Sequence, residues 1–386
     1  MKANNTYLQA VDMAEITELR HRIHRRPCIS GEEKETAEFV CSFLRECKPD
    51  VLLENVGGYG VVATFKGGES GPKILLRCEL DALPITETSG AEYCSQKSGV
   101  AHSCGHDGHI AVLCAIARAI SLNRSLLGSG EITLLFQPEE ETGRGALRMA
   151  EELKKRGVHF DYAIAFHNWP GKKYKSVVLY PECYAWASTG MKIEFLGKQS
   201  HASDPQLALN PTVAIMRLIE KVLSLNQTLS YSTIVNVNIG SEDYGITPGE
   251  GYVALTARSQ TDKGLQTLVS QIEDDAIKLA AENSLAVNIS YTDSFPATVN
   301  TPKLTQMIEE TAEQLGYTTE KDYEGTHGSD DFVHFTKMST QSSFFDIGAG
   351  EEHPQLHNSA FDFDDSLIPV FVEIISCVCR RILQTL

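Results

Sequence analysis

Residues 102–109 carry the densest set of side chains that could bind a metal ion or move a proton. They read His-Ser-Cys-Gly-His-Asp-Gly-His, so six of the eight have such side chains and two are glycines. On a regular helix Cys104 and His106 would point about 200° apart, because each residue turns the helix by about 100°. They could share a metal ion only in a loop. The apolar residues 110–120 then predict a buried helix, with Asp107 as its N-terminal cap.

Three further candidate ligands, Glu141, His167 and His357, lie in separate segments of the chain. Together with Cys104 and His106 they offer five donors. This is more than one tetrahedral zinc ion with an open position for water would use. The sequence therefore predicts two metal ions that share ligands. Mixed thiolate, imidazole and carboxylate donors suit zinc, manganese or cobalt and do not suit calcium.

Three consecutive carboxylates, Glu139, Glu140 and Glu141, follow an apolar run at residues 131–136. Adjacent side chains there point in different directions, so one could bind metal while its neighbour accepts a proton from metal-bound water. A metal lowers the pKa of bound water from about 15.7 to about 7, which brings the proton within reach of a carboxylate base. An isolated triplet of this kind could also be a solvated acidic turn.

The elements that would position these residues alternate between strands and helices. Apolar runs predict strands over residues 51–53, 60–65, 73–78, 131–136, 162–166 and 343–347. Helical periodicity predicts two helices within residues 14–44, and others over 145–155, 302–315 and 367–383. This order predicts an α/β fold with a mostly parallel sheet. Polar residues follow the carboxyl ends of its strands, where ligands bind in open α/β sheets.

The pattern changes near Ser188. Strands predicted over residues 191–195, 233–239, 252–258 and 287–291 combine with helices predicted over 211–225 and 265–282. The order β-α-β-β-α-β is that of a ferredoxin-like split unit. It predicts an inserted α+β domain over residues 187–297, while residues 1–186 and 298–386 form the catalytic metal-binding domain.

The composition narrows the classes of function. Acidic residues outnumber basic ones 51 to 34 and give a net charge of −17, which argues against nucleic acid or an anionic membrane surface as a partner. No apolar run approaches the ~20 residues of a membrane span. The N-terminus, with Asn4 and Asn5, lacks a secretory signal pattern. Ten scattered cysteines are interpreted as free thiols, so we expect a cytoplasmic protein.

Other chemistry-bearing side chains near the N-terminus are interpreted as structural. Arg20, Arg22, Arg25 and Arg26 form a basic cluster that is typical of a solvated helix face. His21 and His24 have no second ligand type beside them, so they are assigned to the surface or the core.

Seven segments resemble the motifs of one family in their order and spacing. They are Arg-Cys-Glu-Leu-Asp-Ala-Leu-Pro at 77–84, Cys-Gly-His-Asp-Gly-His at 104–109, Phe-Gln-Pro-Glu-Glu-Glu at 136–141, Phe-His-Asn-Trp-Pro-Gly at 166–171, Gly-Lys-Gln-Ser-His-Ala at 197–202, Gly-Ser-Asp-Asp-Phe at 328–332 and Leu-His-Asn-Ser at 356–359. The chain resembles the amidohydrolase branch of the dinuclear-metal aminoacylase and carboxypeptidase superfamily. That branch includes hippurate hydrolases and indoleacetyl-amino acid hydrolases.

The resemblance implies a metal-dependent hydrolase of the amide bond of N-acyl amino acids. Glu140 would be the general base, and Asp81 would orient the site from behind the metal ligands. The ligands of two divalent ions would be Cys104, His106, Glu141, His167 and His357.

The resemblance also assigns a role to the inserted domain, as a lid and dimerisation domain of a homodimer. The histidine that matches His201 reaches the active site of the partner subunit, where it would stabilise the oxyanion by ~3 kcal/mol. Arg258 and Asn168 would contact the substrate. Three positions depart from the family pattern: Glu79 stands where many relatives have Asp, Gly245 stands where Asn is common, and Asp330 stands where Glu is usual.

Three alternatives remain at this point. The protein could be a dipeptidase or carboxypeptidase of the same superfamily, or a non-catalytic metal-loaded protein that binds a ligand. It could also be a cysteine hydrolase with Cys104 as the nucleophile. A binding protein would need neither Glu140 as a base nor His201 as an oxyanion donor.

Overall fold

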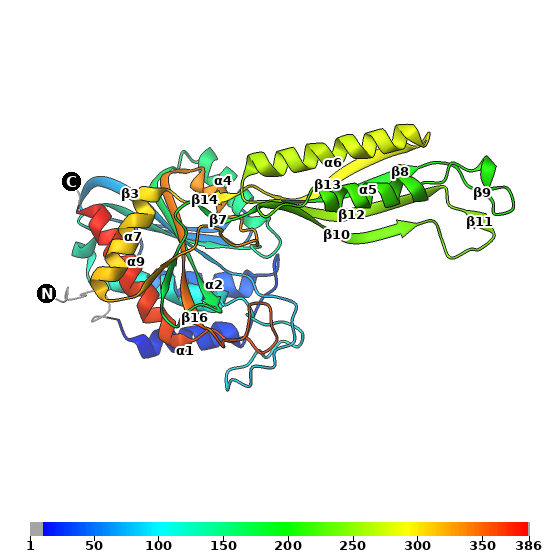
Figure 1. The fold of residues 1–386 in the computed structure, drawn as a ribbon. Coiled ribbons are helices and arrows are strands. Elements are labelled where there is room, and N and C mark those ends of the chain that lie inside the picture. The colour runs from blue at the N-terminus through cyan, green and yellow to red at the C-terminus, as the bar shows by residue number, and fades with distance from the viewer. Residues whose placement is uncertain (1–10, 385–386) are drawn as a thin grey trace. The chain divides into compact units, whose positions relative to one another are not determined.

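The computed structural model describes residues 11–384, which form two compact units (Figure 1). The first unit contains the chain up to Tyr184, Val299–Glu324 and the chain from Asp330 onward. The second contains Ala185–Thr298 and Gly325–Ser329. Asn4 and Asn5 of the N-terminal pattern lie outside the described residues.

A mixed sheet with strand order β1-β2-β4-β3-β5-β16-β6-β15 forms the centre of the first unit. Its strands are β1 (Val51–Val56), β2 (Gly60–Lys66), β3 (Glu69–Glu79), β4 (Ser129–Gln137), β5 (Phe160–Pro170), β6 (Val177–Leu179), β15 (Thr319–Lys321) and β16 (Ser339–Gly350). The central strands β4, β3, β5 and β16 pair in parallel. Antiparallel pairings join β1 to β2, β2 to β4 and β16 to β6. The predicted α/β fold is confirmed.

The helices of the first unit pack against its sheet and against one another. They are α1 (Met13–His24), α2 (Lys34–Cys47), α3 (His106–Leu122), α4 (Gly145–Lys155), α7 (Pro302–Leu315), α8 (Val333–Thr336) and α9 (Ile368–Leu383). Helix α3 packs against α1, α2 and α9, and residues 106–117 are buried on every side of it. A helix that is apolar all round is expected in such a position. The helix predicted after the cysteine–histidine segment is therefore confirmed.

The N-terminus of α3 corrects one prediction, because Asp107 does not cap it. The residue at the cap is Gly105, and no side chain accepts a hydrogen bond there. The carboxylate of Asp107 is buried. It accepts hydrogen bonds from Nη1 of Arg20 at 2.9 Å and from Nδ1 of His24 at 2.8 Å.

The interpretation of the basic cluster as a solvated face is wrong for Arg20. Its side chain is fully buried and pairs with Asp107, with Asp362 at 3.1 Å and with Asp365 at 2.5 Å. Several carboxylates compensate the cost of burying one guanidinium. Arg22, two residues further along α1, is exposed as predicted.

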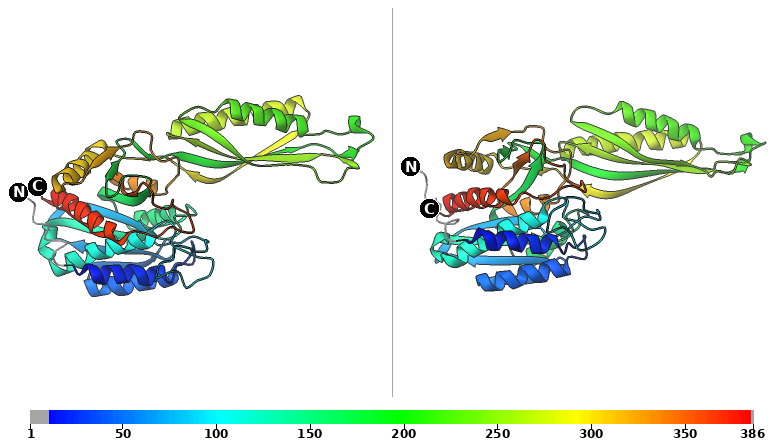
Figure 2. Two further views of the ribbon diagram at one scale, coloured as in Figure 1. Left: turned by 60° about the horizontal axis from the view of Figure 1, so that its bottom comes forward. Right: turned by 90° about the horizontal axis from the view of Figure 1, so that it is seen from below.

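The second unit is a four-stranded antiparallel sheet in the order β10-β12-β8-β13. Its long strands are β8 (Ala187–Leu196), β10 (Ser230–Ile239), β12 (Glu250–Ser259) and β13 (Ala286–Phe295), and a two-stranded ribbon joins β9 (Ser200–His201) to β11 (Ile246–Thr247). Helices α5 (Thr212–Ser224) and α6 (Asp262–Glu282) lie side by side along one face of the sheet (Figure 2). The order β8-α5-β10-β12-α6-β13 is the predicted β-α-β-β-α-β series.

Short elements complete the description. Strands β7 (Cys183–Ala185) and β14 (Thr298–Val299) pair with each other, and single 3-10 turns occur at Arg124–Leu127, Pro205–Leu207 and Asp365–Leu367. Within residues 11–384, no helix combines the length and the apolar character that crossing a membrane requires.

Candidate metal centre

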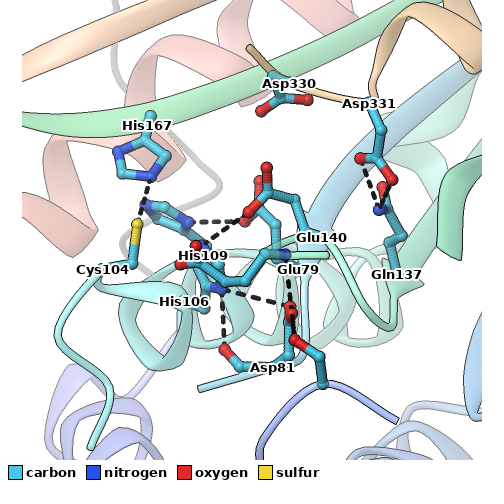
Figure 3. Close-up of polar contacts among 12 residues, drawn as sticks. Glu79, Asp81, Cys104, His106, His109, Gln137, Glu140, His167, Asp330 and Asp331 are labelled. Atoms are coloured by element: carbon cyan, nitrogen blue, oxygen red, sulfur yellow. Dashed lines mark hydrogen bonds and ion pairs between the residues drawn. The ribbon is translucent and has the colours of Figure 1, made fainter. Parts of the chain in front are cut away.

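The carboxyl ends of β3, β4 and β5 lie at one edge of the sheet, and the proposed ligands gather there. Figure 3 shows three of them, Cys104, His106 and His167. His106 begins α3, with Cys104 just before it. Glu141 follows β4, and His167 lies near the end of β5. The fifth residue, His357, comes from a loop whose backbone N–H donates to the carbonyl of Ser103 at 2.8 Å. Four segments of the chain therefore bring the five proposed ligands to one place.

Two overlapping sets of donor atoms form at this edge. Cys104, His106 and His167 offer atoms that all lie within 4.8 Å of one another, and so do Cys104, Glu141 and His357. The shortest distances are 3.4 Å from Sγ of Cys104 to Nε2 of His167 and 3.4 Å from Nε2 of His357 to Oε1 of Glu141. Two sets that share one thiolate fit a pair of metal ions with shared ligands.

Hydrogen bonds behind the histidines turn their other nitrogen toward the centre. Nδ1 of His106 lies 2.8 Å from the carbonyl oxygen of Asp81, and Nδ1 of His167 lies 2.7 Å from that of Asn168. A carbonyl only accepts, so each Nδ1 carries a proton, and Nε2 is the ring nitrogen that is left to face the centre. Nε2 of His106 and Oε1 of Glu141 are buried without a hydrogen-bond partner among residues 11–384. These orphaned donor atoms, in a set of sulfur, nitrogen and oxygen ligands, fit a transition metal.

Asp81 contacts two of the proposed ligands, the ring of His106 and the backbone of Glu141. Its Oδ2 accepts a hydrogen bond from the hydroxyl of Ser30 at 2.7 Å and from the N–H of Glu141 at 3.0 Å. Its Oδ1 lies 3.5 Å from Nδ1 of His106 and has no hydrogen-bond partner within the described part of the chain. Although burial lowers the pKa of His106, the nearby carboxylate of Asp81 and the charge of Glu79 raise that pKa to about 10.

Glu140 sits between the ligands and a second acidic group. One of its oxygens lies 3.8 Å from Nε2 of His106, and its carboxylate lies within 4.8 Å of those of Asp330 and Asp331 (Figure 3). Burial raises the pKa of Glu140 well above its ordinary value, and the charges of Asp330 and Glu141 raise it further. A carboxylate with raised proton affinity is a better general base near neutral pH.

The same acidic surroundings argue against Cys104 as a nucleophile. Burial raises the pKa of its thiol well above the ordinary value, and the charges of Glu141 and Glu140 add to this effect. A catalytic cysteine needs the opposite, a positive environment that lowers the thiol pKa.

A buried chain of polar contacts behind the centre was not found by sequence reasoning. The guanidinium of Arg77 donates to Glu79 and, at 3.1 Å, to Asp331. Oε2 of Glu79 lies 2.7 Å from Nδ1 of His109, whose Nε2 lies 2.8 Å from Oδ1 of Asn168. The side chain of Asn168 is thus buried and bonded to His109. The alternation of Arg77 and Glu79 along β3, and the position of His109 one helical turn after His106, are the signals that could have revealed this chain.

His201 and Arg258 belong to the second unit, whereas the donor sets described above belong to the first. His201 is exposed, and its Nδ1 lies 3.1 Å from the backbone nitrogen and 2.8 Å from Oγ of Ser203. Arg258 lies on β12 and donates to the carbonyl of His327 at 2.9 Å.

Comparisons with known proteins give consistent matches over nearly the whole chain. Residues 75–381 match the model of peptidase family M20/M25/M40. A hippurate hydrolase from Campylobacter jejuni is 30% identical over 363 residues, which cover 92% of this chain and 93% of that protein. An N-acetyl-L-cysteine deacetylase from Bacillus subtilis is 29% identical, with 91% of this chain and 84% of that protein covered.

Solved structures agree in fold. A protein from methicillin-resistant Staphylococcus aureus has a TM-score of 0.91 at 25% identity, over 99% of this chain and 100% of that one. A dinuclear metal-binding peptidase of the M20 family from Bacillus subtilis has a TM-score of 0.85 at 24% identity, over 97% of this chain and 99% of that one.

Proposed function

Because the chain belongs to peptidase family M20/M25/M40, we propose that it hydrolyses the amide bond of N-acyl amino acids. It is a metal-dependent hydrolase of amide bonds, and relatives named as a hippurate hydrolase and as N-acetylcysteine deacetylases act on substrates of this class. These names do not favour a dipeptidase, a carboxypeptidase or a non-catalytic binding protein. The observation that carries the proposal is the pair of donor sets that share Cys104, with Glu140 beside them.

Five residues are proposed as ligands of two divalent ions of zinc, manganese or cobalt. When bound, such ions would polarise the substrate carbonyl and lower the pKa of a water molecule. The ligands are Cys104, His106, Glu141, His167 and His357.

Glu140 would move the proton. Its carboxylate would accept a proton from the attacking water and then donate it to the nitrogen of the leaving amino acid. Asp81 would hold the ring of His106 and the backbone of Glu141 in place through its carbonyl and its Oδ2.

A homodimer through the second unit is proposed together with a role for His201. Helix α5 exposes Val213, Met216 and Leu223, which would gain from burial against a second copy. Nε2–H of His201 would donate to the oxyanion in the active site of the partner subunit.

Arg258 and Asn168 are the proposed substrate contacts. Arg258 would pair with the carboxylate of the amino acid, because a guanidinium binds a carboxylate with two parallel hydrogen bonds. Nδ2 of Asn168 has no hydrogen-bond partner within residues 11–384 and could donate to the acyl group. We also propose a reducing cytoplasmic location, since core cysteines such as Cys47 and Cys114 are free thiols.

The test is a substrate screen with defined metals. Protein stripped with a chelator is reloaded separately with zinc, manganese and cobalt and assayed on N-acetyl and N-benzoyl amino acids, dipeptides and longer peptides. We expect hydrolysis of acyl amino acids that is lost on chelation and restored by metal. Protein that binds two ions per chain yet cleaves no acyl amino acid in the panel would contradict the proposal.

A further inference from the structure

The turn between α1 and α2 reaches the segment that carries Glu140 through the side chain of Glu33. The carboxylate of Glu33 is buried. Its Oε1 accepts hydrogen bonds from the N–H of Gly31 at 2.9 Å and from the N–H of Glu139 at 2.8 Å. A side chain 106 residues earlier in the chain therefore holds the backbone next to the proposed base.

The backbone at Glu139 has an unusual conformation that this contact supports. Its φ is 52°, in the left-handed region. For a residue with a Cβ atom this costs about 1–2 kcal/mol, so surrounding contacts must hold it in place. The hydrogen bond from its N–H to Glu33 is one such contact, and the ion pair between its side chain and Arg148 is another.

The same turn also supports the other side of Glu140. The N–H of Glu141 donates to Oδ2 of Asp81, and the hydroxyl of Ser30 donates to that same oxygen at 2.7 Å. The N–H groups of the residues on either side of Glu140 are thus both hydrogen-bonded to buried carboxylates. One of these, Glu33, lies on the turn, and the other is held by it.

We propose that Glu33 is a positioning residue for Glu140, which it orients by holding the left-handed backbone of Glu139. The inference rests on the proposed role of Glu140 as the general base. Glu33 itself touches neither the substrate nor the reacting atoms.

The role of Glu33 depends on reach and on an acceptor oxygen, and its charge is not required. Both N–H groups converge on Oε1, while Oε2 has no hydrogen-bond partner among residues 11–384. Burial raises the pKa of Glu33 to about 7. Glutamine keeps the length and the acceptor oxygen without the charge, whereas aspartate keeps the charge and is shorter by one methylene group.

The test compares Glu33→Gln with Glu33→Asp, with Glu32→Gln as the matched control. Glu32 is exposed on the same turn. We expect Glu33→Asp to lower kcat by roughly 10- to 100-fold at unchanged KM and metal content, because a small displacement of a catalytic group has an effect of this size. Glu33→Gln and Glu32→Gln should stay within about threefold of wild type.

A second measurement follows the backbone without turnover. Hydrogen exchange of residues 137–143 in the metal-free proteins should show one amide that loses protection in Glu33→Asp and keeps it in Glu33→Gln. Wild-type protein that cleaves no acyl amino acid would refute the proposed function, and the exchange result would still judge Glu33. A Glu33→Asp variant with the kcat and the hydrogen exchange of wild type would overturn the inference. Equal losses of kcat in the two Glu33 variants would overturn it too. So would loss of bound metal in Glu33→Asp, because that would indicate general structural support.

Discussion

Gly105 lies so close to Asn168 that a Cβ atom on Gly105 would be 2.4 Å from the Oδ1 of Asn168. Gly105 also has a φ of 95°, which disfavours any side chain. We expect Gly105→Ala to lower the free energy of unfolding of the metal-free protein by about 2–4 kcal/mol, the sum of the backbone cost and the overpacking. Denaturant titration of the metal-free proteins measures this free energy of unfolding. The control is Gly316→Ala, at a φ of 91° with open space around it. Equal losses in the two variants would rule out the close approach as a cause.

Glu140→Gln removes the proposed proton acceptor and preserves the volume of the side chain. We expect kcat to fall by roughly 10²- to 10⁴-fold, the usual contribution of general base catalysis, with bound metal unchanged. Steady-state kinetics and elemental analysis measure the two quantities. Glu151→Gln, at an exposed carboxylate on α4, is the control and should keep wild-type kcat. Loss of metal in Glu140→Gln would show that this residue is a ligand.

Cys104→Ala removes the donor that the two ligand sets share, so both ions should bind more weakly. In cobalt-loaded protein the thiolate-to-metal charge-transfer absorption should disappear, and fewer than two ions should remain per chain after gel filtration. Cys114→Ala, at a buried thiol within α3, serves as the control. An unchanged spectrum in Cys104→Ala would exclude Cys104 as a ligand.

Arg20→Ala should destabilise the protein by about 3–5 kcal/mol, because it leaves Asp107 buried without its main cation. Arg22→Ala, from the exposed face of the same helix, should cost less than ~1 kcal/mol. Thermal or chemical unfolding of both variants measures the two losses of stability and shows whether Arg20 and Arg22 differ in burial. Similar small losses would restore the interpretation of Arg20 as a surface residue.

Asp346 should make stability depend on pH. Burial raises its pKa to about 8, despite hydrogen bonds from the hydroxyls of Tyr180 at 2.6 Å and Tyr184 at 3.2 Å. An unfolded aspartate has a pKa near ~4, so between about pH 4 and 8 the native state binds the extra proton. Its contribution to stability is complete below ~4 and is lost as pH rises through about 8, at no more than ~1.4 kcal/mol per pH unit.

Asp346→Asn cannot titrate, so its free energy of unfolding relative to wild type should increase with pH across this range. Urea titrations at intervals from pH 5 to pH 8 measure the difference. Parallel pH curves for the two proteins would contradict the assignment.

The sequence predicted the long elements because their patterns are local. The short apolar run in β3 and the apolar helix α3 are confirmed, and each needs only its own residues to be recognised. The strands β6 and β15 were missed, since three residues are too few to show a period. Arg20 and Arg22 look alike in sequence, and only distant partners show which one is buried: Asp107, 87 residues away, and Asp362 and Asp365, more than 340 residues away.

Prediction of the site had the same limit, because local patterns are visible in a sequence and contacts between distant segments are not. Candidate ligands could be selected by residue type, yet the supporting contacts join segments that no local pattern connects. Glu33 was not considered, because a glutamate in a turn with Glu32 beside it resembles an ordinary solvated residue. Its link to the site is the hydrogen bond that its carboxylate accepts from the N–H of Glu139, and no local pattern predicts this contact.

Because the second unit is inserted in the sequence of the first, the proposed ligands are synthesised in two groups, one before the insertion and one after it. Cys104, His106, Glu141 and His167 all precede the insertion, whereas His357 follows it by sequence. A ribosome that adds roughly 5–20 residues per second needs about 10–40 s to translate the stretch between His167 and His357. The nascent chain therefore carries four of the five proposed donors, a thiol among them, through the making of the entire second unit before the last histidine exists. Ions captured in that interval would be held by an incomplete and more exchangeable set of ligands.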